Sequence, residues 1–207
     1  LPYEGAGYWY IRPFVLKQNT AATRSSATSL VWAEQGLVKK FKMSTASTDR
    51  LIQSADGRTI VDSGIPDRVF RFGPTSWQEM CDEVEGSIES VSVDGSRIVA
   101  CNYLEQGMRC RLLSCGGLGA DGFQWEQVGD DVNVPRVQLV AMSENGHTLA
   151  ISSPHSTNVY RLQSDGSWQT LGNVISGGYD LAMSLNGATI AVRASGGKVQ
   201  ILKTDAA

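Results

Sequence analysis

The stretch SENGHTLAI, residues 143–151, decides the fold, because a turn signal here leads directly into a short apolar run. An Asn-Gly or Asp-Gly pair supplies the positive φ angles of a tight type I′ turn, so the residues on either side are expected to form a hairpin. The same pattern recurs at residues 54–57, 92–95 and 184–187, each time followed by a β-rich apolar run. The chain is therefore predicted to consist of repeats.

Two further strands are expected after each hairpin. The third covers residues 69–72, 110–113, 159–162 and 199–202, and the fourth begins at Trp77, Trp125 or Trp168. A unit of four short antiparallel strands that recurs along a chain is typical of a propeller blade.

A fifth copy is expected near the N-terminus, where residues 27–33 resemble residues 188–194. With Ser26 in place of the turn glycine, the turns lie near residues 26, 57, 95, 146 and 187, at intervals close to the roughly 40–45 residues of a blade. The last copy lacks a tryptophan strand, which the strand around Trp9 can supply, and such closure removes open sheet edges.

We therefore expect one all-β domain over residues 1–207, a small β-propeller of about five four-stranded blades closed by the N-terminal strand. The alternative is a β-sandwich or solenoid whose Asp-Gly hairpins recur by coincidence.

The combined pattern S-x-[DN]-G-x-x-[IL]-[AV], V-x-[RQ]-[FL] and W-x-x-x-G resembles degenerate WD40-like β-propeller repeats, from Trp9 to Lys203. The Trp-Asp dipeptide of WD40 blades is absent, as are the full Asp-box of sialidase propellers and the calcium loops of integrin-type blades. The resemblance implies a platform that binds partners across one face or in its central depression.

Composition narrows the range of partners. The net charge is −3, and no basic stripe stands out beyond Lys39, Lys40 and Lys42, which argues against nucleic acid. No apolar run approaches the roughly 18 residues of a membrane span. Residue 1 is Leu, and this favours a processed chain that is secreted or lies in an organelle lumen.

Four residues are candidates for binding. Glu89 and Asp180 fall on predicted first strands, where carboxylates could face a central pocket as in the five-bladed glycosidases that this arrangement resembles. The alternative places Glu89 in solvent at a blade margin. Trp125 and Trp168 could stack on sugar rings, but a Trp at a fixed repeat position more often packs between blades. No zinc-ligand pair or nucleotide-binding loop occurs, so neither a metal nor a cofactor is expected.

Among the four cysteines, Cys101 and Cys110 are placed symmetrically about a turn expected at Glu105 and Gln106. Directly opposed residues of a hairpin lie within disulfide range, so the two could form a bridge, or they could be two buried thiols. A second bridge between Cys81 and Cys115 is compatible with the pattern, but the spacing does not argue for it.

The expected function is a non-enzymatic protein-interaction module or an accessory subunit of a larger assembly. The alternatives are a carbohydrate-binding, lectin-like propeller and, third, a glycosidase-like enzyme. An insertion at Ser114 to Phe123 is expected to be an exposed loop at the rim, because it is rich in glycine.

Overall fold

The computed structural model describes residues 8–11, 14–18, 30–34, 39–42, 51–62, 66–119 and 122–203. Side chains are described from Ile52 onward, except within residues 117–122 and at Ser195. The strands near the N-terminus are β1 (Tyr8–Ile11), β2 (Phe14–Gln18), β3 (Leu30–Glu34) and β4 (Lys39–Lys42).

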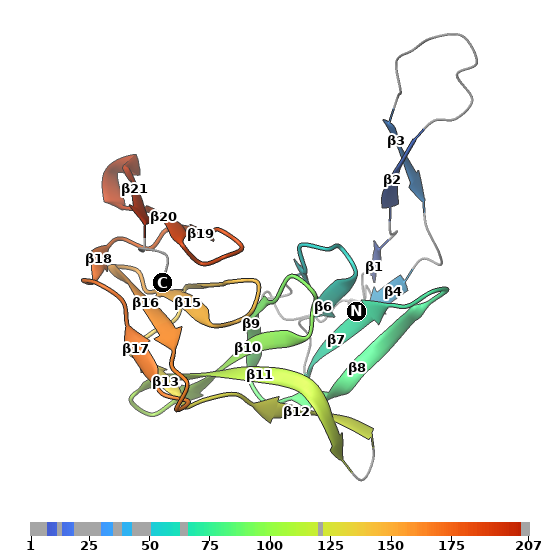
Figure 1. Cartoon of the computed structure of the whole chain (residues 1–207), viewed down its shortest axis with the longest axis horizontal. Coiled ribbons are helices and arrows are strands. Elements are labelled where there is room, and N and C mark those ends of the chain that lie inside the picture. The colour runs from blue at the N-terminus through green and yellow to red at the C-terminus, as the bar shows by residue number, and fades with distance from the viewer. Residues whose placement is uncertain are drawn as a thin grey trace, which may run out of the picture.

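Most of the described chain forms four antiparallel sheets that follow one another in sequence. Their strands are, in order, β5 (Leu51–Gln53), β6 (Thr59–Asp62), β7 (Asp67–Phe72) and β8 (Trp77–Val84); β9 (Ser87–Val91), β10 (Arg97–Leu104), β11 (Gly107–Gly119), β12 (Gly122–Gln127) and β13 (Val132–Val134); β14 (Leu139–Met142), β15 (Thr148–Ser152), β16 (Ser156–Leu162), β17 (Trp168–Thr170) and β18 (Ile175–Ser176); and β19 (Asp180–Met183), β20 (Thr189–Arg193) and β21 (Val199–Lys203), with a 3-10 turn at Ser195–Gly197. Figure 1 shows these sheets side by side in chain order. The all-β, propeller-like architecture is confirmed.

The four turns are built differently from the prediction. Gly57, Gly95, Gly146 and Gly187 have φ angles between 69° and 72°, but Cys81 is the one described non-glycine residue with a positive φ. A type I′ turn needs positive φ at both central residues, so that assignment is wrong. The glycine itself is required, because its left-handed conformation is costly for other residues.

A side-chain network takes the place of the two-residue turn, and it explains the Ser-x-Asp/Asn-Gly pattern. In the third sheet, the Ser143 hydroxyl donates to Asn145 Oδ1 at 2.9 Å and accepts from the Thr148 N–H at 2.9 Å. The Asn145 Oδ1 also accepts from the His147 N–H at 3.0 Å. The same three bonds recur in the other three turns. The serine and the Asx residue therefore hold each loop together from within.

Adjacent sheets pack through alternate side chains. Val61 and Val69 of one sheet bury against Ile88 and Ile98 of the next. The same kind of cluster joins the second sheet to the third and the third to the fourth. Because neighbouring sheets bury their facing sides in this way, the apolar core runs as a series of seams between sheets rather than as one central mass.

The turns also join neighbouring sheets. The Asp56 N–H donates to the Val93 carbonyl at 3.3 Å, and the Glu144 N–H donates to the Leu185 carbonyl at 2.7 Å. Arg71 donates to the carbonyl of Asp94 in the next sheet. These hydrogen bonds, all accepted by backbone carbonyls, connect each turn to the neighbouring sheet.

The N-terminal expectation is not confirmed. β1, which contains Trp9, pairs with β4, and β3 pairs with β2. The turn expected near Ser26 lies outside the described residues. β21 has β20 as its partner among the described strands, so ring closure by the N-terminal strand is not observed.

The structure also corrects the prediction that the insertion from Ser114 to Phe123 is a loop. Most of it extends β11 and β12 into a long hairpin instead of forming a loop, with Cys115 opposite Trp125 and Leu118 opposite Phe123. β-Pairing satisfies the backbone of a glycine-rich segment that has few side chains to bury. Phe123 is nevertheless 58% exposed.

Both cysteine pairs are disulfides. Cys101 and Cys110 lie opposite each other about the predicted turn, with a Cα–Cα distance of 4.1 Å, which confirms the pairing expected from the sequence. Cys81 and Cys115, 6.1 Å apart at Cα, join β8 of the first described sheet to β11 of the second. Disulfides persist in oxidising compartments, so this pair of bonds is typical of such an environment.

Candidate functional site

A cavity of about 470 Å³ lies where β7 and β8 meet the β11–β12 hairpin. We call it the hairpin cavity. It exists because the long hairpin reaches the neighbouring sheet, to which the Cys81–Cys115 disulfide ties it. Its volume falls within the range of small-molecule sites. It is lined by Arg58, Arg71, Phe72, Gly73, Gln78, Glu79, Met80, Cys81, Cys115 and Phe123.

The cavity has two basic side chains. Arg71 is half-buried and is held by the Asp94 carbonyl and by the Asp56 carboxylate, at 3.9 Å. Arg58 is exposed and takes part in none of the ion pairs found among the described residues. Its guanidinium therefore has donors to offer a ligand, and a guanidinium can bind two oxygens of a carboxylate or phosphate group at once.

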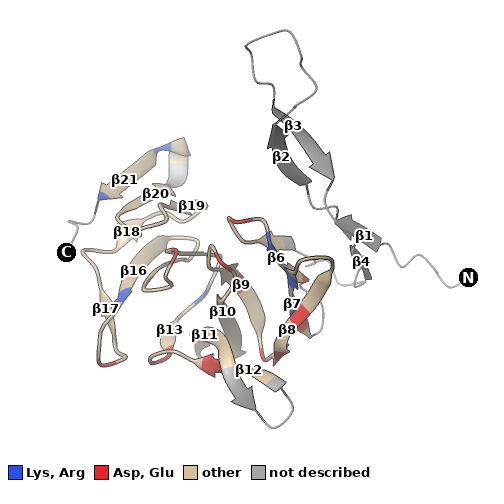
Figure 2. Cartoon of the chain, turned by 45° about the vertical axis from the view of Figure 1, so that its right-hand side comes forward, with Lys and Arg blue, Asp and Glu red and all other residues tan. Residues whose placement is uncertain are grey.

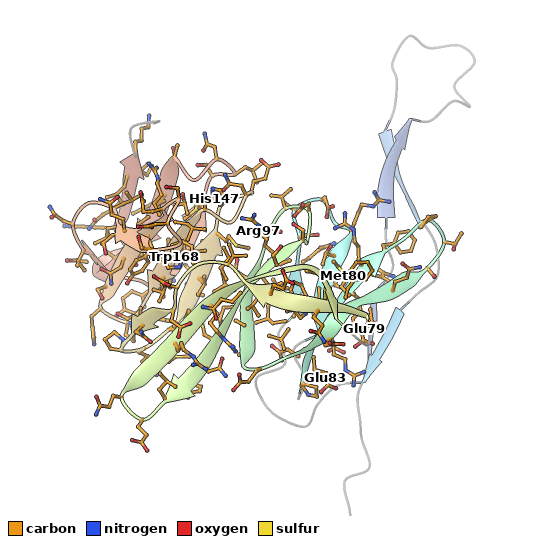
Figure 3. All side chains as sticks on the ribbon, turned by 60° about the horizontal axis from the view of Figure 1, so that its bottom comes forward. Glu79, Met80, Glu83, Arg97, His147 and Trp168 are labelled. Atoms are coloured by element: carbon orange, nitrogen blue, oxygen red, sulfur yellow. A yellow bond between two sulfur atoms is a disulfide. The ribbon has the colours of Figure 1, made fainter. Side chains whose placement is uncertain are left out.

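The remaining walls are apolar, amide-bearing or acidic. Phe72 is buried and contacts Trp77, with ring centroids 5.2 Å apart, so its position is fixed by packing. Figure 3 marks Glu79 and Met80, which contribute from β8. The Glu79 carboxylate lies 3.7 Å from Arg68, which offsets part of its charge. The cavity therefore presents a cation and an amide beside aromatic and thioether surface.

A second cavity, of about 370 Å³, lies at the β10–β11 turn. Its lining has no charged side chain: Leu104, Gln106, Gly107, Met108, Asn133, Val134 and Pro135. With fewer polar groups to orient a ligand, it is the weaker candidate.

The turns carry the clearest electrostatic features. Burial acts to raise the pKa of Asp94, but hydrogen bonds from Ser96 and Ser92, together with nearby Arg71, hold that pKa below its usual value. Partial burial, and then the charge of Arg97, lower the pKa of His147. Figure 3 shows Arg97 and His147, which come from adjacent sheets. The hydrogen bonds that lower the pKa of Asp94 lie within its own turn, whereas Arg71 and Arg97 act on Asp94 and His147 from the neighbouring sheet.

The structure does not gather the four candidate residues from the sequence into one pocket. Glu89 is half-buried on β9, whereas Asp180 is exposed on β19 and pairs with Arg193 at 2.6 Å. Neither residue lines either of the two cavities. A shared acid–base role for the two carboxylates remains a prediction.

The two tryptophans contact the seams between sheets. Trp125 packs against the cluster that joins the first two described sheets. Trp168 packs against the next cluster, and its indole Nε1–H donates to the Asp130 carbonyl at 2.9 Å. A ligand-binding role for either residue remains a prediction.

The hairpin cavity was not predicted from the sequence. Arg58 and Arg71 occur at ordinary hairpin positions, and Phe123 lies in the segment expected to be a loop. The one signal was the long insertion itself, since extended loops often carry function.

Within the part of the chain that is described, no cluster of three or more His, Cys, Asp or Glu side chains could hold a metal ion. The same residues include no helix of the length and apolar character needed to cross a membrane.

No family model and no curated protein matches the chain. Solved structures do match. Kluyveromyces lactis Hsv2p, a β-propeller, has a TM-score of 0.55 at 18% identity, with 81% of this chain and 52% of that one covered. A protein from Lactobacillus plantarum has a TM-score of 0.51 at 15% identity, with coverages of 94% and 64%. The chain thus spans about half to two thirds of the length of these two proteins.

A further match is described as a "putative 6-phosphogluconolactonase" from Bacteroides fragilis, with a TM-score of 0.47, 19% identity, and coverages of 67% and 42%. A protein with an enzyme's name thus stands among the matches, and this corrects the expectation of a non-enzymatic interaction module or accessory subunit as the function. The likeness to Hsv2p shows that the chain has a β-propeller-like, all-β fold.

Proposed function

We propose that this chain binds a small organic anion in the hairpin cavity. The observation that carries the proposal is the meeting of Arg58, which is without an ion pair among the described residues, and the Phe72 and Phe123 rings on one cavity of about 470 Å³. Arg58 would hold a carboxylate or phosphate group, and the aromatic rings would contact an apolar body. Gln78 adds an amide that can donate or accept a hydrogen bond.

The two disulfides support a secreted or lumenal location, where thiols oxidise. The cavity depends on one of them, since Cys81 and Cys115 lie in its wall. We further propose that the repeats are degenerate WD40-like repeats with a fifth copy near the N-terminus. The four identical turn networks support this proposal.

The test is calorimetric titration of the full chain with phenyl phosphate, benzoate and neutral benzamide. Phenyl phosphate and benzoate should bind more tightly than benzamide, and their affinity should fall as salt rises. Arg58→Gln should weaken phenyl phosphate binding by about tenfold or more, because it removes the charge but keeps a polar side chain.

Arg136→Gln is the matched control, since Arg136 is an exposed arginine that lines neither cavity. It should leave the affinity unchanged. Equal binding of the neutral and anionic probes, or equal losses in the two variants, would contradict the proposal.

A further inference from the structure

The sheet β19–β21 differs from the three before it in what covers one of its faces. Paired positions on the second and third strands repeat from sheet to sheet: Val61 with Val69, Val99 with Leu112, Ala150 with Val159, and Ala191 with Ile201. In the first three sheets these pairs contact the following sheet. They define what we call the forward face of each sheet.

Exposure of the third-strand residue shows the difference. Val69, Leu112 and Val159 are 1%, 1% and 5% exposed, whereas Ile201 is 67% exposed. The second-strand partners show the same contrast in exposure. Val61, Val99 and Ala150 are fully buried, whereas Ala191 is only half-buried. Figure 1 shows β19–β21 at the end of the row of sheets. Its forward face is thus a packing surface of the same design as the other three.

The forward face of this sheet has an apolar centre and a charged margin. Alternation places Ala182, Ala191, Val199 and Ile201 on one side, and Ala182 and Val199 are exposed as well. Lys203, at the C-terminal end of β21, is the one charged residue of that strand (Figure 2). At the margin lie the Asp180–Arg193 ion pair and Lys203. An apolar centre with a polar rim is the usual anatomy of a protein interface.

We propose that this forward face is a self-association surface, where two copies of the chain pack their β19–β21 sheets face to face about a two-fold axis. A two-fold interface requires a surface that complements itself. The apolar centre meets the same centre, and the margin carries both signs of charge, so that Asp180 of one copy can lie near Lys203 or Arg193 of the other. Aligned sheet packing then restores the burial that Ile201 lacks.

The experiment is sedimentation velocity of the full chain between about 1 and 300 µM, with three single-site variants. The native chain should show a concentration-dependent dimer. Ile201→Lys and Ala182→Lys place the same charge on different strands of the forward face, and each should raise the dimer dissociation constant at least about tenfold. Both side chains are exposed, so circular dichroism should show an unchanged fold.

Gln200→Lys is the matched control, because Gln200 is exposed on the same strand but points to the opposite face. It should leave the dissociation constant within about twofold of the native value. The proposal is overturned by a chain that stays monomeric throughout, as it would if an N-terminal strand or further blade covered this face. It is also overturned by a dimer that Gln200→Lys weakens as much as Ile201→Lys, which would indicate pairing through the β21 edge.

Discussion

Replacing Gly95 with alanine tests the idea that the turn glycines lock neighbouring sheets together. Gly95 has a φ of 72°, and a Cβ added there would lie 2.5 Å from the Cβ of Thr59 in the preceding sheet. Gly172 has a nearly identical φ of 66°, yet a Cβ there would meet nothing within 4 Å. The two glycines therefore share the conformational cost and differ in packing.

The expected magnitudes follow from these two contributions. A left-handed alanine costs about 1–2 kcal/mol in either turn. At Gly95, forcing a methyl group against the Thr59 side chain adds about 1–3 kcal/mol, as in other overpacked sites. Gly172→Ala should thus lower the free energy of unfolding by about 1–2 kcal/mol, and Gly95→Ala by about 2–5 kcal/mol.

Urea unfolding followed by far-UV circular dichroism measures both values. For a domain of this size the extra loss at Gly95 also corresponds to a melting temperature lower by several degrees. Thr59→Ala in the Gly95→Ala background should recover part of the loss, because it removes two of the clashing atoms. Equal destabilisation by the two glycine variants, to within about 0.5 kcal/mol, would refute the packing argument.

Two further predictions concern the turn network and the disulfides. Ser143→Ala should lower the free energy of unfolding by about 2 kcal/mol in the same urea assay, because the buried Thr148 N–H loses its acceptor; a change below about 0.5 kcal/mol would refute a structural role for the serine. Limited treatment of the native protein with dithiothreitol should open Cys81–Cys115, which lines the hairpin cavity, before Cys101–Cys110, whose residues are each 1% exposed. Alkylation and peptide mapping would detect the order, and simultaneous loss of both bonds would contradict it.

In the four sheets from β5 to β21, the sequence by itself determined most of the strands and their hairpin partners. Local signals carry this information: the Ser-x-Asp/Asn-Gly loops begin and end strands, and alternation then fixes the register. The position of Cys101 opposite Cys110 followed from the same reasoning, because only nine residues separate the two and one turn joins them. The tryptophan strands were found for the same local reason, since each follows directly on the strand with which it pairs.

Contacts between sheets were decided only by the tertiary structure. The Cys81–Cys115 bond and the hairpin cavity join segments with no shared local pattern, and they depend on how far the β11–β12 hairpin reaches. Glu89 and Asp180 were both expected on first strands of the repeats, but Glu89 is half-buried, whereas Asp180 is exposed and pairs with Arg193. The exposure of Ile201, at a position where Val69 and Val159 are buried, likewise depends on the neighbouring sheet. A repeat pattern specifies each sheet, whereas burial and pocket formation depend on what packs against it.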